Sequence, residues 1–593
     1  MGGRSAHTGN KELKMKKAFR ILTLVLALTT SGTVLAGCKD NGGSKEGSKN
    51  EIVVEPFSGS GFGFQWLKDL ATEWMADNPN YTIKVKENST YLSGTQLAQI
   101  EAGTTTTDVY FGSYPNYSSG FYKGYFEDLT DMLSMKPEGG LTVQEKIIDF
   151  DNWKKVASKV AYDDATDTFS YSGCYMLPHS VTLTGLVYDH DQFLNNGWLT
   201  YAANTDEVKS ALTAQGITYE VFGDRLIFKS ATGIVNYEAN DEILTAGKDG
   251  KYGTYDDGQP ETMAQFSAMV NNIVASSKIP FIYSSSDEYV TELVNAYVVQ
   301  YAGMDAYDAL TAFDSNGKEI KLRDGTSKVI DWNNGYLAHS VDGIEKAVSF
   351  VNDYFVKDSK YFTTGNYVQD AQDKFISGGI GQGDFVAMIM EGNWFELEAS
   401  ETLKSAGKRN PEKGYGKVDY RMMLLPEIEG QKGIDGEGNG TVFPAVESGA
   451  IAIRKQADAD KLAAIKSFVL YTLTDKALSE TTVKTGLIRG YKYDLSAKQI
   501  ASMTPYQKTC YQIYQDTDNI KLITHTTDVL RSPFPYAATG YTPDVGMLPC
   551  NGVQSIVNSL KSGKTVAQVV DGIANNYNQT KWDGFLTSIK NSL

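Results

Sequence analysis

Three aspartates in a glycine-rich stretch are side chains whose type and spacing could hold a metal ion. The stretch is GKDGKYGTYDDGQP, residues 247–260, and it carries Asp249, Asp256 and Asp257. Carboxylate oxygens in a loop that glycine allows to turn sharply suit Ca²⁺, although the spacing differs from the EF-hand pattern. The alternative is two hairpin turns, Asp249-Gly250 and Asp257-Gly258, whose acids face water. An ion bound here would be structural rather than catalytic.

The sequence offers no arrangement of side chains that is typical of catalysis. Glycoside hydrolysis requires two carboxylates that face one sugar, and Asp287 and Glu391 form no recognisable pair. No G-x-S-x-G elbow occurs, the five histidines lack metal-ligand spacing, and Cys174 has no evident base. The glycine-rich loop SGSGFG, residues 58–63, lacks the Gly-Lys-Ser/Thr ending of a phosphate-binding loop. We therefore expect a protein that is not an enzyme and that requires no cofactor.

Cys38 lies where an export signal would be cleaved. Basic residues within 16–20 precede an apolar run at 21–28, and small residues follow, which is the order of a secretory signal. Residues 35–38, Leu-Ala-Gly-Cys, resemble the bacterial lipobox, whose cysteine receives a diacylglycerol and becomes the first residue of the mature protein. We therefore expect acyl chains such as palmitate on Cys38, and translation from Met15. The alternative is an ordinary signal peptide or a single transmembrane anchor in which Cys38 is incidental.

The composition describes a globular chain behind a short tether. Residues 38–50 are rich in Gly, Ser and Lys, as flexible linkers are. The 593 residues exceed what one core usually holds, so we expect more than one domain. The net charge of -17 argues against a nucleic-acid partner. If Cys38 is lipidated, Cys174, Cys510 and Cys550 remain, and either a Cys510–Cys550 bridge or three buried thiols would fit.

Strand and helix signals alternate along the chain. Residues 51–56 and 81–85 are strand candidates on either side of 65–78, where apolar residues recur at helical spacing. The order strand, helix, strand implies parallel βαβ units and an α/β layer fold. Further along, YEVFGDRLIFKS (219–230) alternates around Gly223-Asp224, which predicts a β-hairpin.

Seven ordered motifs carry a resemblance to a known family. They are NPNYTIKV (78–85), TDVYFGSY (107–114), MLPHSVTLTGLVYDHDQF (176–193), VAMIMEGNWFE (386–396), MMLLPEIEG (422–430), ESGAIAI (447–453) and KTGLIRG (484–490). In order and spacing they resemble extracellular solute-binding protein family 1, the maltose-binding-protein-like family that supplies sugars to ABC importers. The resemblance covers most of residues 51–593. It implies a periplasmic-binding-protein-like type II fold, in which two α/β lobes surround a cleft and are joined by interlobe crossovers.

The resemblance also divides the chain into segments. They are 1–37 as leader and signal peptide with the lipobox, 38–50 as the tether, 51–178 and 444–486 as the N-lobe, and 179–443 and 487–593 as the C-lobe. The chain is longer than is usual in the family, and the excess lies at 195–260 and 490–550. Open parallel sheets bind ligands at the carboxyl ends of their strands, which agrees with a site in the cleft between the lobes.

Trp394, in EGNW (391–394), is the sugar-stacking residue that the resemblance implies. It directly follows a buried strand candidate, where the family places an aromatic side chain. One face of a pyranose carries C–H groups that pack on an aromatic plane, while its hydroxyls need polar partners. The alternative is a tryptophan packed in the core beside Phe395.

Six further residues are implied as ligand contacts. They are Ser60, Phe62, Tyr114, His179, Asp287 and Tyr289. Alternatives stay open, since Phe62 could pack on the following helix and Tyr114 could be a solvated loop residue. Asp287 could cap the following helix, and His179 could pack in the hinge. The family often has an acid shortly after His179, and this chain has Thr182 there, which leaves the polar contacts open.

The implied function is to bind a carbohydrate and deliver the sugar or oligosaccharide to an ABC transporter permease. The resemblance implies a monomer, lipid-anchored on the extracellular face of a Gram-positive type of cell membrane. An anionic sugar also fits, because a helix that begins after residues 58–63 could hold an anion at its N-terminus. The alternatives are a lipid-anchored sugar sensor for a membrane kinase and a secreted carbohydrate-active enzyme.

Overall fold

The computed structural model describes residues 50–56, 61–87, 94–113, 117–163, 165–166, 168–233, 235–285, 288–378, 384–445, 448–524 and 555–592. All of them belong to one compact unit, residues 50–593. The lipobox, tether residues 38–49, Ser60, Tyr114, Asp287 and Cys550 lie outside the described residues. Cys174 and Cys510 are buried free thiols, so Cys510 is not part of a disulfide. None of the described helices is long and apolar enough to cross a membrane.

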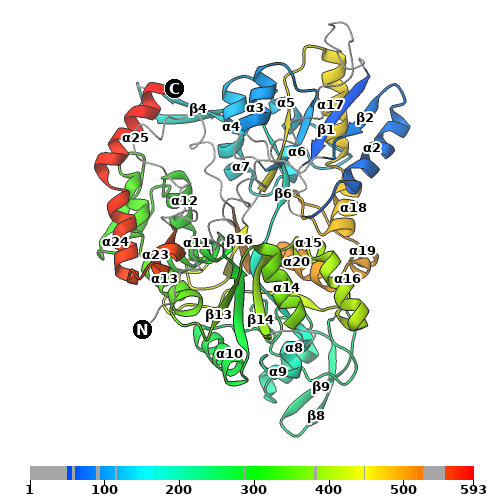
Figure 1. The fold of residues 1–593 in the computed structure, drawn as a ribbon, viewed down its shortest axis with the longest axis vertical. Coiled ribbons are helices and arrows are strands. Elements are labelled where there is room, and N and C mark those ends of the chain that lie inside the picture. The colour runs from blue at the N-terminus through cyan, green and yellow to red at the C-terminus, as the bar shows by residue number, and fades with distance from the viewer. Residues whose placement is uncertain are drawn as a thin grey trace, which may run out of the picture. The chain divides into compact units, whose positions relative to one another are not determined.

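The first of two five-stranded sheets has the order β2-β1-β3-β17-β6 (Figure 1). Its strands are β1 (Glu51–Pro56), β2 (Thr82–Val85), β3 (Val109–Ser113), β6 (Leu177–Val181) and β17 (Ser448–Ile453). β1 runs parallel to β2 and β3, while β17 runs antiparallel to β3 and β6. Helix α2 (Gln65–Asp77) buries Trp66, Leu70 and Trp74 on one side because these apolar residues recur every three to four positions.

The second sheet has the order β13-β10-β14-β7-β15. Its strands are β7 (Thr184–Asp189), β10 (Ile279–Ser284), β13 (Phe362–Gly365), β14 (Val386–Gly392) and β15 (Tyr420–Met423). β10 runs parallel to β13 and β14, and β7 runs antiparallel to β14 and β15. Every residue of β14 is buried, as expected for a central strand that is covered on both faces.

Helices surround both sheets, as Figure 1 shows. With the first sheet lie α3 (Gly94–Glu101), α4 (Tyr117–Tyr122), α5 (Thr130–Leu133), α6 (Val143–Lys146), α7 (Phe150–Ala157), α17 (Ala459–Tyr471) and α18 (Asp475–Thr485). With the second lie α8 (His190–Asn195), α10 (Met263–Ala275), α11 (Glu288–Ala302), α13 (Ile344–Val351), α14 (Val368–Gly378), α15 (Phe395–Glu398), α16 (Ser400–Arg409) and α20 (Pro505–Gln515). The remaining helices include α12 (Met304–Ala312), α19 (Ala497–Ser502), α23 (Ile556–Lys561), α24 (Val566–Asn576) and α25 (Gln579–Ser592).

Short connections carry the chain between the two sheets. Thr182 and Leu183 are the whole link from β6 to β7. Beside this link the Val181 N–H donates to the Ile488 carbonyl at 2.9 Å, so the segment that follows α18 lies against the first crossover. The first sheet therefore draws its strands from residues 51–181 and 448–453, and the second from 184–423. The residue at which each lobe begins and ends stays a prediction.

The region 195–260 forms an insertion with a core of its own. It contains α9 (Asp206–Ala214) and the antiparallel strands β8 (Ile217–Phe222) and β9 (Arg225–Ala231). Phe222 pairs with Arg225 around Gly223-Asp224, which confirms the predicted hairpin. A separate cluster of buried side chains supports it: Ala202, Leu212, Ile217, Leu226, Phe228, Ile243 and Tyr252.

Candidate functional site

The carboxyl ends of the strands in both sheets meet at the first crossover. In the first sheet, β3 ends at Ser113, which pairs with Gly449, and β6 ends at Val181, which pairs with Ser448. In the second, β14 ends at Gly392, which pairs with Thr184 at the start of β7. Because β6 and β7 are joined by two residues, both carboxyl edges lie next to the same link. Ligands of open α/β sheets bind at such edges, so this is the candidate site.

Asn393, directly after β14, forms hydrogen bonds with the first crossover and with the residue that follows α18. Its N–H donates to the Leu183 carbonyl at 3.0 Å, and its Oδ1 accepts from the Leu183 N–H at 3.3 Å. Its Nδ2 donates to the carbonyl of Gly486, the residue that ends α18, at 3.3 Å. The side chain is buried, so each of these hydrogen bonds is costly to leave unmade. The sequence analysis predicted a role for the neighbouring Trp394 and none for Asn393.

Trp394 follows Asn393 and is only 5% exposed. Its ring lies 5.6 Å from that of Tyr289, which is partly buried at the start of α11, with an angle of 57° between the planes. A side chain added at Gly392 would meet the Trp394 ring at 2.2 Å, so glycine is required for this close approach. The structure thus places both predicted contacts together at the carboxyl edge of the second sheet. Their contact with a sugar stays a prediction, since Trp394 is almost fully covered.

Tyr367 is an exposed aromatic residue at the same edge that the sequence analysis missed. It follows β13, whose last residue, Gly365, pairs with Ser284 at the end of β10. The residue is 60% exposed, so it is accessible to a ligand. The only available signal was its position two residues after a short strand, because exposure cannot be read from periodicity over four residues.

The side-chain amide of Gln372 donates hydrogen bonds to two carboxyl groups beside Trp394. Gln372 Nε2 donates to Glu391 Oε1 at 2.9 Å and to Glu398 Oε2 at 2.8 Å. Burial, and then the neighbouring Glu398, raises the pKa of Glu391 to about 8. The sequence analysis recognised no pair that involved Glu391, and the structure provides one. Glu391 is 1% exposed and Glu398 is partly buried, whereas both carboxylates of a glycosidase reach the substrate.

His179 packs inside the first sheet. It is buried on β6, its imidazole stacks on Trp66 with centroids 5.4 Å apart, and it meets Phe111 edge-on at 5.3 Å. Burial, and then the nearby Arg489, holds the pKa of His179 well below its usual range, so the ring is neutral. Arg489 Nε donates to the His179 carbonyl at 2.7 Å. These contacts favour the hinge-packing alternative over direct ligand contact.

Phe62 lies in a loop that reaches the second sheet's helices. Its ring is partly buried, and the adjacent Gly61 has φ +70. A Cβ at Gly61 would lie 3.0 Å from the Glu398 backbone on α15, so only glycine fits between the loop and the helix. The loop thus lies against α15 at Glu398 through Gly61, the residue before Phe62, and the contact of Phe62 with a ligand stays a prediction.

The carboxylates of the three candidate calcium ligands accept hydrogen bonds from backbone N–H groups of their own loop. Asp256 and Asp257 are buried; Asp256 Oδ2 accepts the Lys248 N–H at 2.7 Å, and Asp257 Oδ2 accepts the Gly253 N–H at 2.7 Å. Burial, and then the Asp249 carboxyl, raises the pKa of Asp256 to about 8. In the described part of the chain, no group of three His, Cys, Asp or Glu side chains could hold a metal ion. The geometry therefore gives the calcium prediction no support. The alternative, with all the acids in water, is wrong for the two buried aspartates.

Comparison with known proteins identifies the fold. No family model matches this chain, and no curated protein does. Among solved structures, it is similar to a chitin oligosaccharide binding protein at 16% sequence identity and a TM-score of 0.50, over 90% of this chain and 100% of that one. The maltose-maltodextrin binding protein of the thermoacidophilic bacterium Alicyclobacillus acidocaldarius matches at 14% identity and a TM-score of 0.46, over 89% and 99%, which is too slight to carry an argument. The chain therefore has the periplasmic-binding-protein-like type II fold that its motifs predicted.

Proposed function

We propose that this protein binds a sugar or an oligosaccharide between its two α/β lobes and delivers it to the permease of an ABC importer. The observation that carries the proposal is the meeting of both carboxyl edges at the two-residue crossover, with Trp394, Tyr289 and Tyr367 on the second sheet's side. The chitin oligosaccharide binding protein that shares this fold supports a carbohydrate as the ligand.

The side chains at the edge suit a ligand with both apolar and polar faces. Aromatic rings pack against the C–H face of a pyranose, and amide or carboxyl groups exchange hydrogen bonds with its hydroxyls. A wrong sugar would leave these polar groups without partners, and this would provide selectivity. Binding without turnover is expected, because the carboxyl pair of Glu391 and Glu398 is held by Gln372.

The N-terminal segment would anchor the protein to the membrane. A diacylglycerol on Cys38 would hold the protein on the outer face of the cell membrane, and residues 38–50 would let it move as a monomer beside its permease. A receptor confined to the membrane meets its permease more often than a freely secreted one. The lipobox motif and the order of segments behind it support this anchoring.

Calorimetry against a panel of monosaccharides and oligosaccharides tests the function. We expect saturable binding of at least one member, with no product when the mixture is analysed by chromatography. Tyr367→Ala should weaken that binding roughly tenfold, the scale of a lost stacking contact. Phe222→Ala is the matched control, because Phe222 is 66% exposed on the insertion hairpin, away from both carboxyl edges.

The same experiment can overturn the proposal. Sugar cleavage would replace the binding protein with an enzyme, and no saturable binding across the panel would remove carbohydrate as the ligand class. Trp394→Ala separates the two roles of that residue, since a core tryptophan lost to alanine costs about 3 kcal/mol or more of stability. If Trp394→Ala lowers stability and leaves sugar affinity unchanged, Trp394 is a packing residue only.

A further inference from the structure

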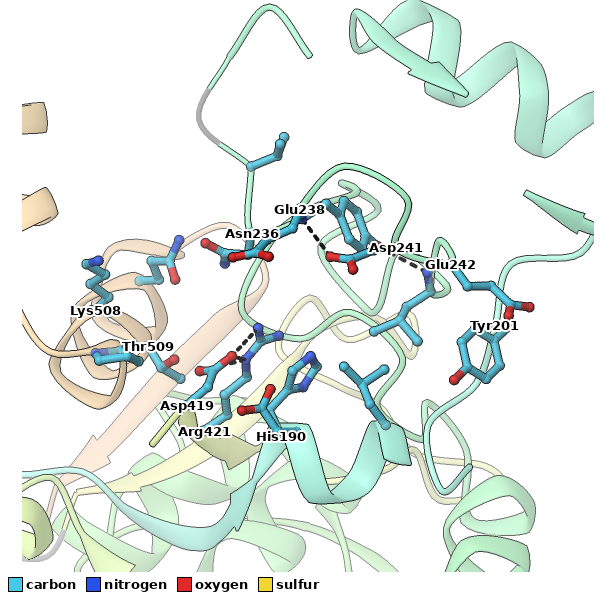
Figure 2. Close-up of a pocket in the computed structure, with 17 residues that line it drawn as sticks. His190, Tyr201, Asn236, Glu238, Asp241, Glu242, Asp419, Arg421, Lys508 and Thr509 are labelled. Carbon is cyan, nitrogen blue, oxygen red and sulfur yellow. Dashed lines mark hydrogen bonds and ion pairs between the residues drawn. The ribbon is translucent and has the colours of Figure 1, made fainter. Parts of the chain in front are cut away.

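A cavity lies away from the crossover, where the insertion meets the second sheet. Its volume is about 650 Å³, within the range of small-molecule sites. The insertion contributes its residues 201 and 235–244, and the opposite wall comes from α8, the start of β15 and α20. Figure 2 shows polar side chains from these elements around one open space. The sequence analysis predicted no site in this place.

Acidic side chains outnumber basic ones in the lining of this cavity. The charges of Asp419 and Arg421 neutralise one another, because the Arg421 guanidinium donates hydrogen bonds to both Asp419 carboxylate oxygens, with Nη2 2.7 Å from Oδ2. Four further carboxylates line the cavity, those of Asp191, Glu238, Asp241 and Glu242, and Lys508 is the one other cation among the lining residues. Arg225, outside the lining, pairs with Glu242 at 3.5 Å, which leaves three carboxylates without an ion pair in the described part of the chain. An anionic ligand would be repelled here, whereas a cation would be attracted.

Backbone hydrogen bonds hold several of these acids in place. Asp241 Oδ2 accepts the Glu238 N–H at 2.6 Å, which closes the turn that presents both carboxylates. Glu242 is held by backbone pairing with Ile227 of β9. Partial burial, and then the carboxylates of Asp189 and Asp419, raises the pKa of Asp191. The charged form of Asp191 is therefore disfavoured by its surroundings, and a bound cation would stabilise it.

His190 adds a buried polar group without a partner. The residue is 5% exposed, it lines the cavity, and its Nδ1 has no hydrogen-bond partner in the described part of the protein. Figure 2 shows its ring standing up from α8 into the cavity beside Arg421. Burial, and then Arg421, lowers the pKa of His190 to about 3, so the ring is neutral. A neutral imidazole has one nitrogen that can accept a hydrogen bond, and an ammonium group can donate that hydrogen bond.

We propose that this cavity is a second ligand site, separate from the sugar site, and that it takes a small organic cation that carries primary amines. Asp191, Glu238 and Asp241, which form no ion pair in the described part of the chain, would attract the ammonium groups, and the cavity volume accommodates a short carbon chain between them. A bare metal ion fits less well, since no described group of acids is arranged to hold one. The unpartnered Nδ1 of His190 could accept a hydrogen bond from one of these ammonium groups.

Titration calorimetry with 1,4-diaminobutane tests the proposal, with 1,4-butanediol as its neutral match. We expect saturable binding of the diamine that weakens as salt is added, and no binding of the diol. Glu238→Gln and Glu242→Gln should each weaken diamine binding roughly fivefold. Glu220→Gln is the control, because Glu220 lies on β8 of the same insertion, pairs with Lys229 at 2.7 Å and does not line the cavity.

Lys508→Gln gives a result of opposite sign. It removes a positive charge from the lining, so the diamine should bind more tightly, by a factor of roughly three to five. A purely structural effect of these substitutions would not tighten binding. The proposal is overturned if the diamine does not bind saturably, if the diol binds equally well, or if both Glu variants match Glu220→Gln. Sugar affinity should be unchanged in all four variants, so this outcome is independent of the sugar-binding proposal.

Discussion

Glu391 shows how a single residue makes stability depend on pH. Its carboxyl is buried at the end of β14, and its pKa is raised to about 8. The folded chain therefore holds a proton there between about pH 4.5 and 8, where the unfolded chain has released it. The contribution of Glu391 to stability is thus full below about pH 4.5 and is lost as the pH rises toward 8.

Glu391→Gln should flatten this dependence. We expect the free energy of unfolding, measured with urea, to fall less between pH 5 and pH 8 in the variant than in the parent, by on the order of a few kcal/mol. Glu401→Gln is the control, since the Glu401 side chain is 86% exposed beside Lys404. An unchanged difference between pH 5 and pH 8 in Glu391→Gln would show that the buried carboxyl does not carry the effect.

At the scale of elements, the insertion is a separate packing unit. Leu226 is fully buried in the cluster that joins β8, β9 and α9, and that cluster is distinct from the main core. Leu226→Ala should cost about 3 kcal/mol through lost contacts and a cavity. We expect faster amide hydrogen exchange in residues 200–260 and unchanged protection in β10 and β14. Equal acceleration in the central strands would show that the insertion and the sheet unfold together.

The elements also show where sequence reasoning works. Residues 219–230 formed the predicted hairpin because Gly223-Asp224 allows the tight turn and the flanking residues alternate. Residues 65–78 formed α2 because their apolar side chains share one helical face. The pattern of residues 247–260 did not decide the role of its acids, because the same glycine-rich pattern suits a metal loop, an exposed turn, or a loop whose acids bind its own N–H groups. Burial decides between these, and burial depends on the rest of the chain.

At the scale of the whole molecule, sugar binding should alter the spatial relation of the two lobes. The proposed ligand lies where both carboxyl edges meet, and Thr182 and Leu183 form a short connection that can act as a hinge. Small-angle X-ray scattering should therefore give a smaller radius of gyration with the bound sugar than without it. Diaminobutane is the comparison ligand, since its proposed site lies within the second lobe and should leave the radius unchanged. A radius that sugar does not alter would argue against hinge closure.

The sequence by itself determined the type II fold and the insertion hairpin, and it predicts the lipid anchor at Cys38. The hairpin follows from alternation and turn residues, whereas the fold and the anchor follow from the resemblance of short motifs to a known family and to the lipobox. Tertiary structure alone decided that His179 packs on Trp66, that Glu391 and Glu398 share Gln372, and that Tyr367 is exposed. It also formed the acidic cavity from residues more than 200 positions apart, such as His190 and Arg421. The physical reason is that exposure and side-chain contacts arise from long-range packing, which a local pattern does not specify.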